Sequence, residues 1–273
     1  SAQFLEKWLT NSDDDPKACY YRASMQYAQG LFSDAVAKAT ECINAGGTTV
    51  YPNLYGVKAL AYNRLGDSVN AKASYEEYFK RQITSKVGPG DYSSYAMILL
   101  KFPGNEAQAA SYVEKAVALD SIEANRVSYL KSLATAYRTQ KNFGESAKWF
   151  NQVLSIKKNY SNVDLYNAGY DYFRAGKFDS SVAVFTKYTA KYPEDIFGYY
   201  MIAKANGGID TTLATGLAFT SYQKAIEIGE KTADQAKIKD QLTGAYTFMM
   251  QYYYNIKNYK LKKILVKGFQ MSY

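Results

Sequence analysis

The chain has 273 residues, 47% of them hydrophobic and 21% charged, a balance that suits one elongated repeat domain or two compact ones and excludes a disordered chain. The formal charge of +8 favours acidic partners, although 33 basic residues spread along the chain are read mostly as solvated surface. The sequence contains no histidine, which excludes histidine-based acid–base catalysis and histidine-containing nucleophilic or metal sites.

The first segment, residues 1–15, contains a short apolar stretch at positions 4–9 and ends just before Pro16. We interpret it as the second helix of a truncated preceding repeat. A capping helix is the alternative, because the ends of a repeat array must be covered. The sequence starts at Ser1 without an initiator methionine, so we expect a processed or trimmed piece of a longer protein. No apolar run approaches 18 residues, so no transmembrane helix is predicted.

Three stretches further along, at residues 59–67, 134–143 and 169–178, share one pattern. Each has a small residue, an aromatic residue three places on, and a turn residue four places beyond that. Five residues after the turn a second helix presents another small residue, followed by two larger ones at steps of four and three. These steps place the residues on one helical face. The second-helix sets are Ala71, Tyr75 and Tyr78; Ser146, Phe150 and Val153; and Ser181, Phe185 and Tyr188.

The same pattern marks other units. The turn positions recur at intervals of 35 to 38 residues, at Gly30, Gly66, Gly104, Lys141 and Gly176. Glycine supplies a positive φ at low cost where a first helix ends. Two further early units are marked by Ala23, Phe32, Ala35 and Cys42, and by Leu100, Ala109, Val113 and Ala116. A sixth unit contains Tyr199, Ala203, Ala218, Tyr222 and Ala225, with an insertion at 206–216, and a weaker seventh contains Met249, Tyr253, Tyr259 and Val266.

The pattern resembles the tetratricopeptide repeat family, whose unit is a pair of antiparallel helices of about 34 residues. The resemblance covers nearly the whole chain. It implies an all-α fold, a right-handed superhelical solenoid of about seven helix pairs that form one array over residues 16–273. The sequence departs from the family in two ways. The proline that usually closes each unit is clear only at Pro193, and some loops, such as 85–91, are longer than usual.

In this family the first helices line a concave face on which an extended peptide or a helix usually lies. Helical phase selects the residues of each first helix that do not pack inward. The candidates for a peptide groove are Tyr20, Tyr27, Asn63, Arg64, Lys131, Arg138, Tyr166, Tyr170, Phe173, Arg174, Tyr200, Lys204 and Tyr254. Tyrosine and arginine often dominate binding energy at protein interfaces. The competing interpretation is that many of these tyrosines only pack between units; it is weakest for the cluster at 166–174.

Some members of the family grip a C-terminal carboxylate with a fixed set of Lys, Asn and Arg residues. Lys131 and Asn167 match two of those places. The remaining places hold Thr135, Phe197 and Met201, which cannot bind a carboxylate in that way. We therefore reject this carboxylate clamp.

Three other features have simple structural interpretations. Cys19 and Cys42 fall on facing helices of one unit, and we interpret them as buried thiols; a disulfide is the alternative, because spacing does not establish the Cβ geometry. The glycine-rich segment 206–212 lacks the ending that a phosphate loop needs and is interpreted as an insertion. The lysine-rich stretch 257–267 is interpreted as the last second helix, with a membrane or phosphate contact as the alternative.

The sequence thus predicts a non-catalytic interaction scaffold that binds a partly acidic, partly apolar segment of another protein, with no cofactor or metal. The alternative is a binder of nucleic acid or anionic membrane through the basic surface. The few cysteines and many tyrosines weakly favour the periplasm or cell envelope of a bacterium over the cytoplasm. Partner identity and oligomeric state are not determined by the sequence.

Overall fold

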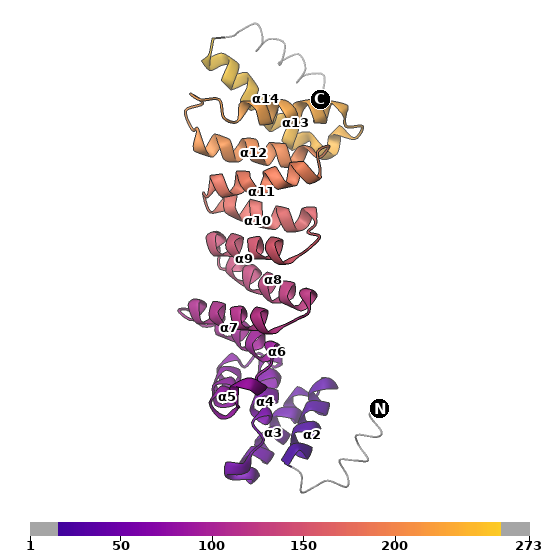
Figure 1. The fold of residues 1–273 in the computed structure, drawn as a ribbon, viewed down its shortest axis with the longest axis vertical. Helices are drawn as coiled ribbons and strands as arrows, with labels where there is room; N and C mark the ends of the chain where they lie inside the picture. The colour runs from indigo at the N-terminus through magenta and orange to yellow at the C-terminus, as the bar shows by residue number, and fades with distance from the viewer. Residues whose placement is uncertain (1–15, 258–273) are drawn as a thin grey trace. The chain divides into compact units, whose positions relative to one another are not determined.

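A computed structural model describes residues 16–257, and this part of the chain is α-helical with no strand. Short connections link the α-helices of this part, which are labelled in Figure 1. In chain order they are α2 (Pro16–Ala28), α3 (Phe32–Gly46), α4 (Asn53–Arg64), α5 (Ser68–Arg81), α6 (Pro89–Leu99), α7 (Glu106–Leu119), α8 (Glu123–Thr139), α9 (Phe143–Ile156), α10 (Asn162–Arg174), α11 (Phe178–Lys191), α12 (Ile196–Ile209), α13 (Phe219–Lys231) and α14 (Lys239–Asn255). Three short 3₁₀ helices occupy connections, at Gly47–Thr49, Thr84–Lys86 and Gln235–Ile238.

The helices belong to two compact units that divide within α8, between Tyr129 and Leu130. In the N-terminal unit the pairs are α2 with α3, α4 with α5, and α6 with α7. In the C-terminal unit α9 packs on α10, and the pairs are α10 with α11 and α12 with α13, followed by α14. Each unit is therefore a stack of antiparallel helix pairs, as the repeat pattern predicts.

Each predicted turn between the two helices of a pair has a left-handed backbone. The φ angles are 81° at Gly30, 84° at Gly66, 89° at Gly104 and 69° at Gly176. Lys141 occupies the equivalent place with φ of 61°, although a residue with a Cβ is strained there. The prediction that these positions end the first helix of each pair is confirmed, including the one position where the sequence does not supply glycine.

The nine second-helix residues of the three clearest units are buried. Small residues at the crossing points let the two helices of a pair approach closely. At Gly169 a Cβ would lie 2.7 Å from the ring of Phe185, a separation that packed atoms do not tolerate. The hydroxyl of Ser181 donates a 2.9 Å hydrogen bond to the Gly169 carbonyl across the same interface. Glycine and serine here permit the contact that larger residues would prevent.

The connections differ from the prediction in two places. The loop expected at 85–91 is shorter, because α6 already begins at Pro89, where a missing backbone N–H costs nothing. The insertion expected at 206–216 starts later, because α12 continues to Ile209. The rest of it folds around Asp210, whose carboxylate accepts hydrogen bonds from the backbone N–H groups of Ala214, Thr215 and Gly216.

Some predictions fall outside the described residues. These are the helix at 4–9, the markers Tyr259 and Val266 of the seventh unit, and the basic stretch 257–267 apart from its first residue. The division into residues 1–15 and one array at 16–273 therefore stays a prediction.

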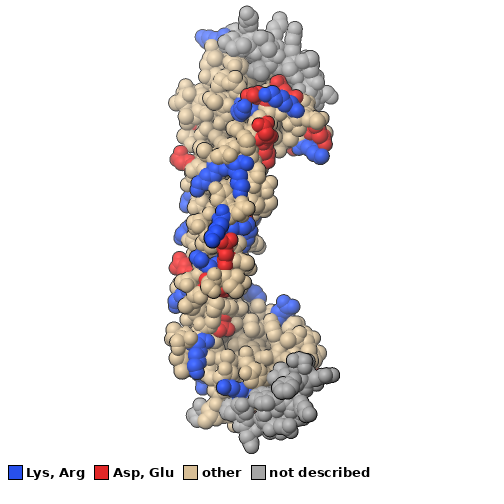
Figure 2. Space-filling view, turned by 45° about the vertical axis from the view of Figure 1, so that its right-hand side comes forward, with Lys and Arg blue, Asp and Glu red and all other residues tan. Residues whose placement is uncertain are grey.

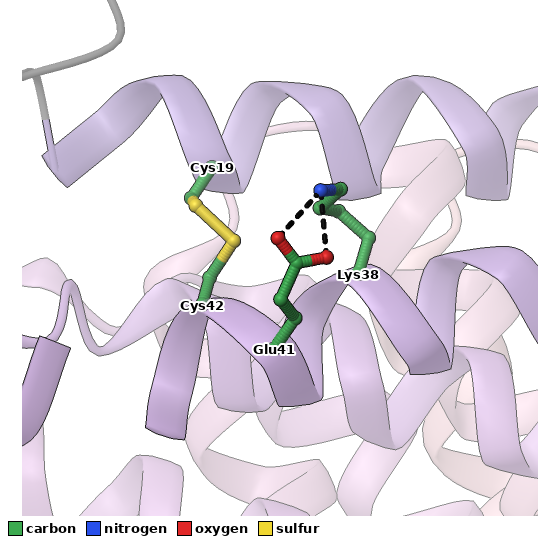
Figure 3. The surroundings of a disulfide bond; sticks show 4 residues. All are labelled: Cys19, Lys38, Glu41 and Cys42. Atoms are coloured by element: carbon green, nitrogen blue, oxygen red, sulfur yellow. Dashed lines mark hydrogen bonds and ion pairs between the residues drawn. A yellow bond between two sulfur atoms is a disulfide. The ribbon is translucent and has the colours of Figure 1, made fainter. Parts of the chain in front are cut away.

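A disulfide bond joins α2 to α3 (Figure 3). Cys19 and Cys42 face each other with a Cα–Cα distance of 6.1 Å, within the range that a disulfide spans without backbone movement. The interpretation of these residues as buried thiols was wrong, because sequence spacing carries no information on Cβ direction. Next to the disulfide, Tyr20 packs edge-on against Tyr51, with ring centroids 5.3 Å apart. The disulfide thus joins α2 to α3, and the Tyr20–Tyr51 contact packs α2 against the segment that leads to α4.

Removal of this disulfide is expected to loosen the first helix pair selectively. The bond closes a loop with a sequence separation of 23, which corresponds to a stabilisation of about 3 kcal/mol in the chain-entropy account. In the Cys19→Ala/Cys42→Ala variant, hydrogen exchange of α2 and α3 amides should accelerate accordingly, while amides of α11 serve as the internal control. Reduction of the wild-type chain should reproduce the effect. Unchanged exchange in α2 and α3 would contradict it.

Candidate binding surface

The predicted groove residues all lie at least partly at the surface of their units. Those of the N-terminal unit are on α2 and α4, and those of the C-terminal unit are on α8, α10, α12 and α14. Of these helices, α2, α4, α10 and α12 are the first helices of the pairs described above. This placement agrees with the helical phase from which the candidates were chosen, and their role in binding stays a prediction.

The candidates of the N-terminal unit are occupied by contacts within that unit. Tyr27 packs against Phe32 with ring centroids 5.4 Å apart, and the guanidinium of Arg64 lies 5.2 Å from the centre of the same ring. Asn63 accepts a 2.7 Å hydrogen bond from Lys101. These side chains close the turns and connect successive pairs, which leaves the C-terminal unit as the better candidate for a binding surface.

Arg138 at the end of α8 is held by a buried carboxylate of α10. Its Nε donates a 2.8 Å hydrogen bond to Oδ2 of Asp171, and its Nη1 donates a 2.9 Å hydrogen bond to Oδ1 of Asn167. Ser146 of α9 donates to the same Asp171 oxygen, and the guanidinium also lies 4.4 Å from the ring centre of Phe150. Arg138 thus joins three helices of the unit, and its charge is neutralised internally.

Lys131 of α8 is held in the same way by Asp164, which lies two turns closer than Asp171 to the start of α10. The carboxylate of Asp164 is 1% exposed and forms 2.6 Å ion pairs with Lys131 and with Lys157. Burial raises the pKa of Asp164, but the hydrogen bonds from Lys131, Lys157 and Ser161 outweigh it and hold the pKa well below its ordinary value. Asp164 also forms the capping box of α10 with Ser161.

Aromatic side chains form a continuous stack along the outer side of α10. The rings of Tyr166 and Tyr170 are stacked with centroids 5.2 Å apart and an interplanar angle of 11°. Phe173 continues the stack at 6.4 Å and 18°. Tyr166 also contacts Phe197 of α12 at 5.5 Å, and Phe197 rests on the buried ring of Phe185. Spacings of four and three residues along α10 produce this alignment.

One cation lies over a ring of this stack, and a second, at the end of α10, lies over a ring of α9. Lys204 of α12 places its Nζ 5.4 Å from the ring centre of Phe173 and 5.6 Å from that of Tyr200. Arg174, at the end of α10, places its guanidinium carbon 3.6 Å from the ring centre of Phe143. Such cation–π contacts are worth about 0.5–1 kcal/mol at exposed sites. We call Tyr166, Tyr170, Phe173, Phe197 and Tyr200, with Arg174 and Lys204, the aromatic face.

Sequence reasoning missed three residues that contribute to this region. Phe197 was considered only as a residue unfit for a carboxylate clamp, whereas it supports the ring of Tyr166. Asp164 and Asp171 were not recognised as the partners of Lys131 and Arg138. Their separation of seven residues, which places two acids on one side of a first helix, is the signal that could have found them. Tyr254, the last candidate, lies at the exposed end of α14 and apart from these contacts.

Within residues 16–257, no helix combines the length and the apolar character needed to span a bilayer. The same residues bring together no group of three or more Cys, Asp or Glu side chains suited to a metal ion.

Comparison with known proteins supports the resemblance to tetratricopeptide repeats. Residues 129–160, which contain the end of α8 and all of α9, match the family model described as tetratricopeptide repeat. This segment carries a tetratricopeptide repeat. The predicted fold class, an all-α solenoid of antiparallel helix pairs, is confirmed by the helices themselves and by the solved structures below. No curated protein matches the sequence at a significant level.

Three solved structures illustrate the shared fold. The C-terminal part of a TPR repeat-containing protein from Cytophaga hutchinsonii aligns with a TM-score of 0.56 and 22% identity over 92% of this chain and 93% of that one. YrrB, a TPR protein with an unusual peptide-binding site, aligns with a TM-score of 0.50 and 14% identity over 88% and 100%. A chain of the Naa15/Naa10 complex bound to HypK-THB aligns with a TM-score of 0.54 and 13% identity, but only 38% of that chain is covered, against 87% of this one. Identities this low establish the fold alone.

Replacement of Asp164 by asparagine is expected to destabilise the C-terminal unit in a pH-dependent manner. Because the folded-state pKa lies below the ordinary value of 3.8, the carboxylate stabilises the fold above that pH and loses this contribution as pH falls below it. At pH 7, Asp164→Asn should lower the free energy of unfolding by about 2–3 kcal/mol, because it leaves two lysines without their buried partner. Denaturant unfolding at several pH values measures this difference.

The difference between wild type and Asp164→Asn should shrink steadily as the pH drops below about 4. Asp179→Asn, which changes an exposed carboxylate on α11, is the matched control and should leave stability nearly unchanged. A gap between wild type and Asp164→Asn that is constant from pH 7 to pH 2 would show that charge is not the source of the stabilisation.

Proposed function

We propose that this chain is a non-catalytic interaction scaffold that binds a segment of another protein, an extended peptide or a helix, on the aromatic face of the C-terminal unit. Tetratricopeptide-repeat proteins generally mediate protein–protein interactions, and YrrB, which shares the fold, is described as having a peptide-binding site. A shared fold does not establish a shared ligand, so the support must come from the surface itself.

The observation that carries the proposal is the aromatic stack on α10. Tyr166 keeps 37% of its surface exposed although it contacts two other rings. The rings of Tyr170 and Phe173 are only half-buried on the same side of the helix. Rings that are already held by their neighbours lose little conformational freedom when a ligand covers them, so more of the contact energy appears as affinity. Partly exposed, pre-ordered aromatic rings are typical anchors of protein interfaces.

The alternative is that the basic surface binds nucleic acid or an anionic membrane. It is favoured by the formal charge of +8. On the face shown in Figure 2, however, Lys and Arg side chains are separated by wide neutral areas and by several Asp and Glu. Lys131 and Arg138 are also neutralised by buried carboxylates. The charge therefore supports this alternative less than its total suggests.

We further propose that the protein works in an oxidising compartment, the periplasm or cell envelope of a bacterium. The support is the disulfide between Cys19 and Cys42, since such bonds persist in oxidising compartments and are rare in the cytosol.

The binding proposal is tested by affinity capture from native lysate of the source organism. The wild-type chain should retain a discrete protein, and the variant Tyr166→Ala/Tyr170→Ala should lose it with a drop in affinity of about tenfold or more. Tyr21→Ala is the matched control, because Tyr21 has the same exposed fraction of 37% but lies outside the aromatic face. Circular dichroism confirms that all three chains are folded. Retention of nucleic acid or lipid that salt removes from every variant would favour the alternative.

The compartment proposal is tested by thiol trapping in intact cells. Rapid alkylation followed by mass spectrometry should find Cys19 and Cys42 protected as a disulfide in the native protein. Alkylation after chemical reduction provides the positive control. Quantitative alkylation of both thiols without reduction would place the protein in a reducing compartment and refute the proposal.

A further inference from the structure

The basic residues of the C-terminal unit that face its first-helix surface fall into two classes. Lys131 and Arg138 are paired with the buried carboxylates of Asp164 and Asp171. Lys204 and Arg174 form no ion pair with any described residue and lie over aromatic rings instead. Both side chains are exposed. Arg174 at the end of α10 and Lys204 in α12 are therefore first-helix cations that keep their charge uncompensated by any described residue.

The geometry of these two cations leaves their hydrogen-bonding groups available. A guanidinium carbon 3.6 Å from the ring centre of Phe143 means that Arg174 is stacked on that ring. An arginine stacked by its face still presents its N–H edge, which matches a carboxylate. The Nζ of Lys204 lies over the rings of Phe173 and Tyr200 at more than 5 Å from either ring centre, so its ammonium retains room for an acceptor.

Acidic groups among the described residues do not fill these positions. Burial and then the nearby charge of Asp240 raise the pKa of Tyr200, so Asp240 lies in the neighbourhood, yet it makes no ion pair with Lys204. Asp210, directly after α12, directs its carboxylate into its own loop, where backbone N–H groups of residues 214–216 bind it. Because no carboxylate of residues 16–257 pairs with Lys204 or Arg174, both cations are open to a carboxylate of another molecule.

From this arrangement we infer that the aromatic face recognises a protein segment in which an Asp or Glu side chain adjoins an apolar or aromatic one. The apolar side chain covers the rings of Tyr166, Tyr170 and Phe173, and the carboxylate pairs with Lys204 or Arg174. This inference rests on the proposed function and adds to it the chemistry of the partner. It differs from a clamp for a C-terminal carboxylate, because the acid is a side chain and the cations are held by rings.

A random peptide library displayed on phage tests this specificity with the full chain as bait. Peptides selected by the wild-type chain should be enriched in Asp or Glu within two residues of Phe, Tyr, Trp or Leu. The variant Lys204→Glu/Arg174→Glu should select peptides without that acidic enrichment and with Lys or Arg in its place. The variant Lys187→Glu, which changes an exposed lysine on the second helix α11, is the control and should select the same peptides as the wild type.

The outcomes separate this inference from the proposed function. If peptides are enriched and lost with Tyr166→Ala/Tyr170→Ala, but carry no acidic residues, the surface binds peptides and the inferred chemistry is wrong. If the selected peptides bind equally well to the Tyr166→Ala/Tyr170→Ala variant, or if none is enriched, both the surface and its chemistry are refuted.

A double-mutant cycle supplies the quantitative check. For a selected acidic peptide, Lys204→Gln should weaken binding about two- to fivefold, the range of one exposed ion pair. The same substitution should have no effect on the peptide in which the acidic residue is replaced by its amide. Equal losses for both peptides would overturn the assignment of Lys204 to a carboxylate.

Discussion

Close approach of two antiparallel helices is the constraint on which the rest of this structure depends. It requires small residues where the helices cross and a left-handed residue where the chain reverses. Gly169 meets the first requirement, since any Cβ there would collide with the ring of Phe185. The positive φ angles at Gly30, Gly66, Gly104, Lys141 and Gly176 meet the second. Once the pairs close, the large residues of each second helix fill the space toward the next pair.

Burial of charge distinguishes the C-terminal unit from a purely apolar stack. Asp164 and Asp171 place two carboxylates on the inner side of α10, where each is matched by cations from neighbouring helices. Isolated, such carboxylates would be costly to bury, but pairing and hydrogen bonds offset the desolvation. This pairing also lowers the free positive charge at the surface, because Lys131 and Arg138 are neutralised by the buried carboxylates. Arg174 and Lys204, by contrast, lie over aromatic rings and form no ion pair with a described residue.

Tyrosine side chains occupy two kinds of place in this chain, the core between helices and the surface. Tyr75, Tyr78 and Tyr188 are buried between helices, where rings fill large volumes. Tyr166 and Tyr170 lie at the surface, ordered by contact with each other. The same residue type thus stabilises the stack and forms the proposed binding face, and only its position relative to the crossing points separates the two roles. This is why composition alone, with 28 tyrosines, did not decide between packing and binding.

The sequence by itself determined the all-α repeat architecture, the turn positions and the buried second-helix residues, because these depend on local spacing at steps of three and four. It also placed the candidate residues on first helices. Only the tertiary structure decided that Cys19 and Cys42 form a disulfide, that α12 continues to Ile209, and that Lys131 and Arg138 are neutralised. These outcomes depend on side-chain directions between helices, and helical periodicity fixes which face a residue occupies but not which partner it meets across the interface.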